Sequence, residues 1–146
     1  DRGGEVTYHG PGQLVVYPII NLKNWGAPVS YVRKLEEIII ATLKDYGIHG
    51  AKALDSTGVW VNHHKIGAIG VKIRRGITHH GLSLNINTDL TFYKYIIPCG
   101  AENALVTSMQ TLIKRPTALK EVRYSLQYHF GRLMQLRMIQ KEEKQI

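Results

Sequence analysis

Two stretches in the middle of the chain alternate between apolar and polar positions, the pattern of β-strands. They cover 65–74 and 77–87, with Gly76 between them. Period-2 geometry places Lys65 on the apolar face of the first strand and His80 on the apolar face of the second, whereas His79 points to the opposite side. A lysine that begins a strand also commonly points into water, and a histidine on such a face is commonly a hydrogen-bonded core residue. Both alternatives stay open on pattern alone.

The remaining patterns predict a strand–helix mixture. Apolar residues recur with helical period in two further stretches, the first after a Gly-Ala-Pro break and closed by Gly47, the second preceded by Pro116. Turn residues rich in glycine and proline at 9–12 separate two short strands; from spacing alone this is simply a tight turn. The expected strands are 5–8, 13–20, 58–62, 65–74 and 77–87, and the expected helices are 28–46, a short turn after Thr88, and 117–138.

Length and composition indicate one globular domain. The chain has 146 residues, 44% of them hydrophobic and 21% charged, and a domain of this size buries roughly 70% of the surface of its unfolded chain. No apolar run approaches the roughly 18 residues that a membrane span requires, so a soluble protein is expected. Because the sequence begins with Asp1 rather than methionine and almost directly on the glycine pair at 3–4, we treat it as a possible fragment.

A net charge of +8 favours acidic partners. Part of the excess lies in Lys72, Arg74 and Arg75. Nucleic acid is disfavoured because no helix-turn-helix, zinc-finger or RNP pattern is present. The sequence contains one cysteine, Cys99, which cannot form an internal disulfide and which is also a common buried, inert residue.

Among site chemistries, zinc and nucleotide binding are poorly supported. The pairs His63-His64 and His79-His80 are adjacent, so their members face opposite sides of a strand and chelate poorly. The segment GAIGVK lacks the spacing and the Ser/Thr of a phosphate-binding loop. Thiol chemistry fits better, because a desolvated lysine has a lowered pKa and can deprotonate a cysteine. Lys65 is the candidate for that lysine.

With these residues in view, the chain resembles the lipoyl(octanoyl) transferase family over nearly its whole length. The matching motifs are RGGEVTYHGPGQLVVYPI at 2–19, GVWV at 58–61, KIGAIGVKIRRGITHHGLSLN at 65–85 and IIPCG at 96–100. The resemblance implies an α/β (α+β) fold like the catalytic domains of biotin and lipoate protein ligases, with a mixed sheet, a smaller sheet and flanking helices. It also implies a single catalytic domain, 1–146, that lacks the N-terminal strand and helix segment of the family.

The resemblance implies an acyltransferase that moves an octanoyl group from acyl carrier protein to a lysine of lipoyl domains or of the glycine-cleavage H protein. The nucleophile falls on Cys99 and the catalytic lysine on Lys65. Neither a cofactor, a metal, a nucleic acid nor a membrane is implied, and a monomer is expected, in a mitochondrion or in a bacterial cytoplasm, with the basic pI favouring the former. Substrate-binding positions implied by the motifs are Arg2, Gly3, Gly4, His9, Gly67, Ala68, Ile69, Gly70, His80, Gly81 and Leu82.

Two alternatives remain at this stage. An ATP-dependent lipoate or biotin ligase would share the fold, although PCG at 98–100 and the missing nucleotide loop count against it. A non-catalytic basic binding module is the other. Docking of the acidic carrier on Lys72, Arg74 or Arg75 is a further hypothesis.

Overall fold

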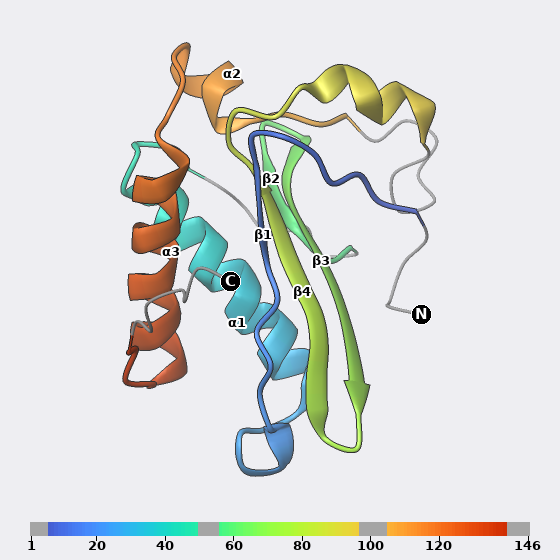
Figure 1. Cartoon of the computed structure of the whole chain (residues 1–146), viewed down its shortest axis with the longest axis vertical. Coiled ribbons are helices and arrows are strands. Elements are labelled where there is room, and N and C mark those ends of the chain that lie inside the picture. Colours follow the sequence, from blue (N-terminus) through green and yellow to red (C-terminus); the bar gives the residue numbers. More distant parts are fainter. Residues whose placement is uncertain (1–5, 50–55, 97–104, 140–146) are drawn as a thin grey trace, which may run out of the picture.

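Four strands form one antiparallel sheet in the computed structural model, which describes residues 6–49, 56–96 and 105–139. The strand order is β1-β4-β3-β2, so the sheet has β1 and β2 at its edges (Figure 1). The bounds are Gln13–Val16 for β1, Val59–Val61 for β2, His64–Arg74 for β3 and Ile77–Asn85 for β4. The α/β fold class is confirmed, and no second sheet occurs among the described residues.

The central hairpin of β3 and β4 forms because its turn suits a right-handed twist. The two turn residues, Arg75 and Gly76, both have positive φ, 53° and 84°, as the favoured two-residue hairpin turns require. The register then runs without interruption from Arg74 opposite Ile77 to Gly67 opposite Leu84. The second hairpin, from β2 to β3, turns in the same way at Asn62 and His63, with φ of 48° and 63°. The neighbouring strands expected at 58–62, 65–74 and 77–87 are therefore present and form these two hairpins.

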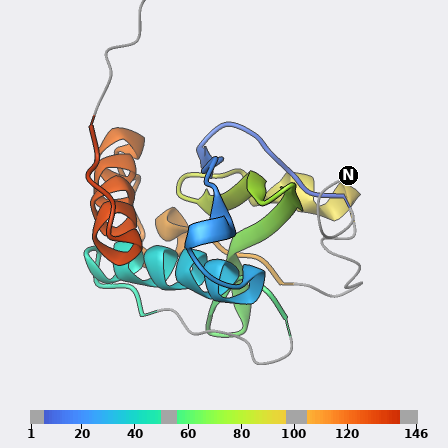
Figure 2. The same cartoon turned by 90° about the horizontal axis from the view of Figure 1, so that it is seen from below.

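Helix α1, Pro28–Lys44, lies across one face of the sheet (Figure 2). Proline at its first position costs no hydrogen bond there. Its apolar stripe is buried, and Ile39 packs so closely on Gly67 that an added Cβ would lie 3.1 Å from Ile39 Cδ1. Burial of the stripe outweighs the low helix propensity of its β-branched residues.

Helix α3, Leu119–Met134, packs on α1 and completes the core (Figure 1). It ends four residues earlier than predicted because Gln135 adopts a left-handed conformation and closes the helix. Three short elements complete the chain: η1 (Leu22–Asn24), η2 (Leu90–Tyr95) and α2 (Met109–Ile113). The short turn expected after Thr88 is η2, and Asp89 caps it, since its side chain accepts from the Thr91 amide. The strand expected at 5–8 does not form over the described residues 6–8.

A bulge at the start of β3 corrects the face predicted for Lys65. Val59 of β2 pairs with Gly67, but the next residue, Trp60, pairs with Lys65, so β3 carries one extra residue between these pairs. Consecutive residues of β2 point to opposite faces, and Gly67 faces α1. Lys65 therefore shares the face of Trp60, opposite α1, and not the helix-covered face that simple alternation predicted.

The segment 105–107 continues the sheet beyond the end of the β3–β4 ladder. Val106 forms an isolated parallel bridge with Lys65. The Lys65 amide donates to Leu105 O at 2.8 Å, and the Thr107 amide donates to Lys65 O at 2.9 Å. The backbone of Lys65 is thus fixed on both sides. Across the described ranges, no helix is long and apolar enough to cross a membrane.

Candidate active site

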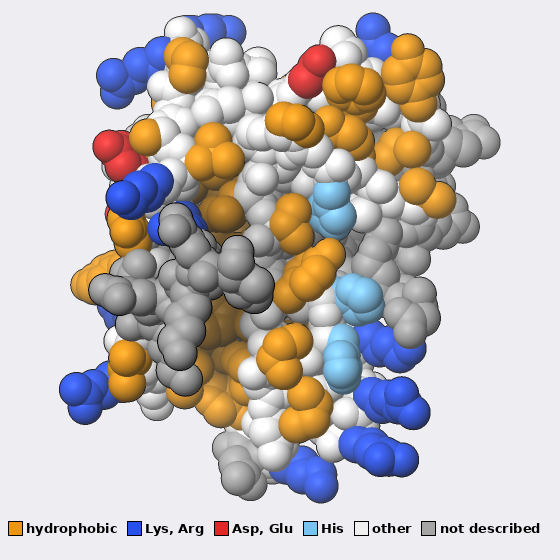
Figure 3. All heavy atoms as spheres, viewed as in Figure 1, with side chains coloured by type: hydrophobic (Ala, Val, Ile, Leu, Met, Phe, Trp, Pro, Cys, Tyr) orange, Lys and Arg blue, Asp and Glu red, His pale blue; other side chains and the backbone are white. Residues whose placement is uncertain are grey.

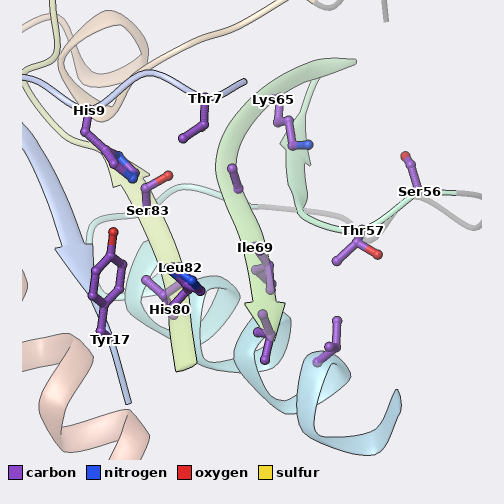
Figure 4. A pocket seen from close by; sticks show the side chains of 15 residues that line it. Thr7, His9, Tyr17, Ser56, Thr57, Lys65, Ile69, His80, Leu82 and Ser83 are labelled. Carbon is purple, nitrogen blue, oxygen red and sulfur yellow. The ribbon is translucent and has the colours of Figure 1, made fainter. Parts of the chain in front are cut away.

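A cavity of about 390 Å³ opens beside the sheet, walled by β3, β4 and the segments around His9 and Thr57. This volume lies in the range of ligand sites. Figure 4 shows Lys65 on one side and His9 and Tyr17 on the other, with β3 and β4 between them. The lining residues are Thr7, His9, Tyr17, Val32, Ser56, Thr57, Lys65, Ala68, Ile69, Gly70, Val71, His80, Gly81, Leu82 and Ser83.

Lys65 is half-buried at the edge of this cavity. Its Nζ lies 4.9 Å from the centroid of the Trp60 ring, a cation–π distance. The bulge places the two side chains on one face, and Gly58 lies beside the lysine stem: a Cβ at Gly58 would lie 2.8 Å from Lys65 Cε. The amide of Gly58 donates to the buried carboxylate of Glu36 at 3.1 Å. The stem of Lys65 is therefore held against a backbone that α1 anchors.

His80 has a left-handed backbone, φ 59°, inside strand β4. Such a conformation is uncommon for a residue other than glycine and costs on the order of 1–3 kcal/mol. The Tyr17 ring meets the His80 ring edge-on, with centroids 5.8 Å apart. Both residues line the cavity, so the strained position belongs to its wall.

His9 is held by a tight turn that contacts the end of β4. Gly12 has φ 79°, and a Cβ there would lie 2.3 Å from the backbone oxygen of Asn87, so only glycine fits. The Gly12 carbonyl accepts from the amides of Ile86 and Asn87 at 3.3 and 2.9 Å. The His9 Nδ1 lies 2.8 Å from Gln13 Oε1. The tight turn predicted at 9–12 is therefore confirmed, and it also places His9 in the cavity wall.

Of the substrate-binding positions predicted from the motifs, the structure gathers seven around this cavity, together with Lys65. Gly67 lines a neighbouring cavity of about 20 Å³, with Lys65, Ser83 and others. That volume suffices for about one water molecule. The seven are His9, Ala68, Ile69, Gly70, His80, Gly81 and Leu82. Four further predicted residues, Arg2, Gly3, Gly4 and Cys99, lie outside the described residues.

The sequence patterns did not identify several of the residues that line the cavity. Ser83 faces its strand partner Ala68, and both have small side chains, which leaves room on the face opposite α1. A clue was available in the sequence: Ser83 and Asn85 are polar residues inside an apolar strand, which indicates a second covered face. The structure buries all of residues 81–85. Tyr17, Ser56 and Thr57 come from separate segments that only the fold brings together.

A basic surface lies at the β3–β4 turn. Arg74 and Arg75 are exposed there, as is His79, and the stem of Lys23 packs at Gly76, within 2.9 Å of a Cβ built on that glycine. Figure 3 shows the Lys and Arg side chains gathered at the lower right of this face, next to histidines. His80 and Gly81 of β4 line the cavity, so the basic surface lies on the same hairpin as the site. No group of three His, Cys, Asp or Glu residues in the described ranges could hold a metal ion.

Comparison with known proteins gives one family match and many relatives. Residues 1–131 match the model of the lipoyl protein ligase A/B catalytic domain. An octanoyltransferase from Solibacter usitatus is 50% identical over 140 residues, which cover 95% of this chain and 63% of the relative. A probable octanoyltransferase from Schizosaccharomyces pombe is 51% identical over 111 residues, 75% of this chain and 51% of the relative. A chloroplastic octanoyltransferase of Arabidopsis thaliana is 52% identical over 116 residues, 78% of this chain and 41% of the relative.

This chain thus spans 41–63% of the length of these relatives. Among solved structures, a lipoate-protein ligase A bound with ATP aligns with a TM-score of 0.77 at 19% identity, over 97% of this chain and 61% of that one. A biotin protein ligase from Aquifex aeolicus aligns with a TM-score of 0.69 at 14% identity, over 85% of this chain and 53% of that one. At these identities the structural matches establish the fold alone.

Proposed function

Because the chain belongs to the family of lipoyl protein ligase A/B catalytic domains, we propose that it transfers an octanoyl group from a carrier thioester to a protein lysine. One observation carries the proposal. The motif residues His9, Lys65 and His80, far apart in the chain, line one cavity of ligand size. Relatives about 50% identical are named octanoyltransferases.

The first step uses Cys99 as nucleophile. Lys65 in its neutral form takes the thiol proton, and the resulting thiolate attacks the thioester carbon of octanoyl-acyl carrier protein. The new carbon–sulfur bond forms as the bond to the carrier sulfur breaks, and Lys65 returns its proton to that leaving thiolate. The product is an octanoyl thioester on Cys99, with the octanoyl chain in the cavity.

The second step transfers the acyl group to an amine. A lysine of a lipoyl domain, or of the glycine-cleavage H protein, supplies the nucleophile. Its neutral amine attacks the carbonyl carbon of the Cys99 thioester. The amide bond forms, the carbon–sulfur bond breaks, and the proton lost by the amine goes to the Cys99 thiolate with Lys65 as carrier. A thioester becomes an amide, so the transfer is downhill and ATP is not required.

Covalent geometry supports a meeting of Cys99 with Lys65. Cys99 is three positions after Ile96, and a chain spans at most ~3.6 Å per residue. Ile96 directly follows η2, whose Tyr93 lines the same small cavity as Lys65. On the other side, the Leu105 carbonyl accepts from the Lys65 amide. Described residues on both sides of Cys99 in the sequence therefore lie near Lys65.

The donor in this proposal is an acidic carrier protein, and the basic surface offers it a docking place. Lys23, Arg74 and Arg75 lie on the sheet end that borders the cavity. Such a surface steers an acidic partner and accelerates encounter. The acyl arm of a carrier docked there would reach along β4 toward His80.

The proposed function is tested by mixing the chain with octanoyl-acyl carrier protein and the H protein without ATP. Mass spectrometry of the H protein is expected to show one octanoyl addition, lost in Lys65→Ala. A parallel reaction supplies free octanoic acid with ATP. Addition only in that second reaction would overturn the proposal in favour of a ligase, and addition in neither would overturn both.

A further inference from the structure

A chain of buried polar side chains leads from the backbone next to Lys65 to the His9 ring. It begins at the Thr107 carbonyl, which accepts from Asn85 Nδ2 at 3.1 Å. A carbonyl can only accept, so the amide nitrogen of Asn85 must face Thr107. The amide oxygen of Asn85 then faces the opposite way, toward Gln13 and Tyr93. This fixes the orientation of a side chain that is only 3% exposed.

Asn85 in turn fixes Gln13. Asn85 Oδ1 accepts from Gln13 Nε2 at 2.9 Å and from the Tyr93 hydroxyl at 3.2 Å. Gln13 Nε2 also donates to the Tyr93 oxygen at 3.2 Å, so the three groups form a closed triangle. Rotating the Gln13 amide would bring its oxygen against Asn85 Oδ1, two acceptors without a proton between them. Gln13 is 8% exposed, so water does not relieve that conflict.

Gln13 then decides which nitrogen of His9 carries the proton. With Nε2 of Gln13 committed to Asn85, its oxygen faces His9 Nδ1 at 2.8 Å. That oxygen can only accept, so Nδ1 must be protonated. In a neutral imidazole the other nitrogen, Nε2, is then a bare acceptor. Among the described residues, nothing donates to it. Figure 4 shows the His9 ring pointing into the cavity.

We propose that Gln13 and Asn85 are positioning residues that lock neutral His9 in its Nδ1–H tautomer, so that Nε2 accepts a hydrogen bond from the incoming lysine amine. The amine role rests on the proposed function. His9 is exposed at the mouth of the cavity, where an acceptor side chain enters. A hydrogen bond from one amine N–H to Nε2 aligns the nitrogen lone pair with the thioester carbon. His9 exchanges no proton in this role; the amine proton leaves by way of Lys65.

The same hydrogen bonds connect the His9 side of the cavity with the Lys65 side. Thr107 accepts from Asn85 and donates through its amide to Lys65 O. The position of the His9 ring and that of the Lys65 backbone are therefore set by the same buried amide. Tyr93 ties η2, which leads toward Cys99, into the triangle.

The tautomer is tested without any activity measurement. Histidine labelled with ¹⁵N is incorporated into the chain, and long-range ¹H–¹⁵N correlation spectra are recorded at a pH at which imidazole rings are neutral. The His9 signals are those lost in His9→Asn. The expected pattern is a protonated Nδ1 and an unprotonated Nε2. The opposite tautomer in the unsubstituted protein would overturn the proposal.

Two variants separate positioning from simple support of the fold. Gln13→Leu removes the acceptor opposite His9 Nδ1, so a mixture containing the Nε2–H form is expected. Gln127→Leu, an exposed glutamine on α3, is the matched control and leaves the His9 spectrum unchanged. An unaltered tautomer in a folded Gln13→Leu variant would contradict the lock.

The amine role is tested by timing the two half-reactions separately. With octanoyl-acyl carrier protein alone, His9→Asn is expected to slow acyl-enzyme formation less than it slows the second step, because His9 also lines the cavity. When H protein is then added, loss of the acyl group is expected to slow about tenfold, the effect of one hydrogen bond. Equal slowing of both steps would overturn the role. If the unsubstituted chain transfers nothing, the proposed function and the amine role fail together, while the NMR result still decides the tautomer.

Discussion

Gly81 offers the sharpest test of how the cavity wall is packed, because an added methyl group there would meet backbone. An alanine Cβ at Gly81 would lie 2.2 Å from Val16 O and 2.6 Å from Pro18 Cδ. Ordinary van der Waals contact begins near 3.4 Å, so the carbonyl must retreat by more than 1 Å. The β1–β4 pairing of Val16 with Leu82 lies directly beside this point. Gly81→Ala must therefore separate the end of β1 from β4.

The cost follows from overpacking and lost pairing. Overpacking a tight site costs ~1–3 kcal/mol, and each weakened sheet hydrogen bond adds about 1 kcal/mol. We expect Gly81→Ala to lower the free energy of unfolding by ~3 kcal/mol, and with ~2.1 cal/mol/K of unfolding entropy per residue, to lower Tm by about 10 °C. Urea unfolding followed by circular dichroism measures the former and calorimetry the latter.

Gly67→Ala on the neighbouring strand is the matched control. Its Cβ would lie 3.1 Å from Ile39 Cδ1 and 3.3 Å from Ile39 Cγ2. These are side-chain atoms, and a shift of a few tenths of an ångström relieves the contact. We expect a change within ~1 kcal/mol. If Gly81→Ala were as stable as Gly67→Ala, the close contact of β1 with β4 would not exist as described, and the placement of Tyr17 against His80 would fall with it.

Three further predictions concern separate features. Reversing both charges at Arg74 and Arg75 to glutamate is expected to raise KM for the carrier donor at least tenfold and to weaken its salt dependence, with kcat little changed. Thr78→Val removes a hydroxyl that accepts from the Ile20 amide at 2.8 Å and is fully buried, so chemical unfolding should show a loss of ~1–3 kcal/mol. The pKa of Asp45 is lowered by its hydrogen bond from Ser125, so its contribution is present above the unfolded-state pKa near 4 and is lost as pH falls through the lower folded-state value.

A control variant or a second pH checks two of these predictions. Charge reversal of Lys114 and Arg115, exposed between α2 and α3, should leave KM unchanged; an equal rise would point to net charge rather than to docking. Asp45→Asn should unfold more easily than the unsubstituted protein at pH 6, and the difference should shrink as the pH falls toward 2.5. Because the Asp45 side chain is 46% exposed, the difference at pH 6 should stay below ~1 kcal/mol. A difference of the same size at pH 2.5 would contradict the ionic origin.

Local pattern predicted the elements of this fold well where one rule governed them. Alternation gave β3 and β4 and their turn, and the 3.6-residue stripe gave α1. The same rule misplaced Lys65, because a bulge inserts a residue before Gly67 and exchanges the two faces. A bulge depends on which residues of β2 pair with β3, and single-strand periodicity carries no such information.

Only those residues of the candidate site that belong to recognisable sequence motifs could be predicted. His9, Lys65 and His80 were singled out by their sequence context, and the structure gathers them around one cavity. Gln13 and Asn85 were not singled out, because their pairing spans 72 residues and becomes visible only when β1 lies beside β4. A glutamine or asparagine in a short apolar strand indicates that a buried hydrogen-bond partner exists. The sequence does not identify that partner.

The proposed Cys99 acyl-enzyme is tested most directly by a single covalent measurement. The chain is mixed with octanoyl-acyl carrier protein without an acceptor, quenched in acid, digested and mapped by mass spectrometry, beside Cys99→Ala. One octanoyl group is expected on the peptide that contains Cys99, and none on the variant. An octanoyl group retained by Cys99→Ala, or located on another residue of the unsubstituted protein, would contradict the mechanism.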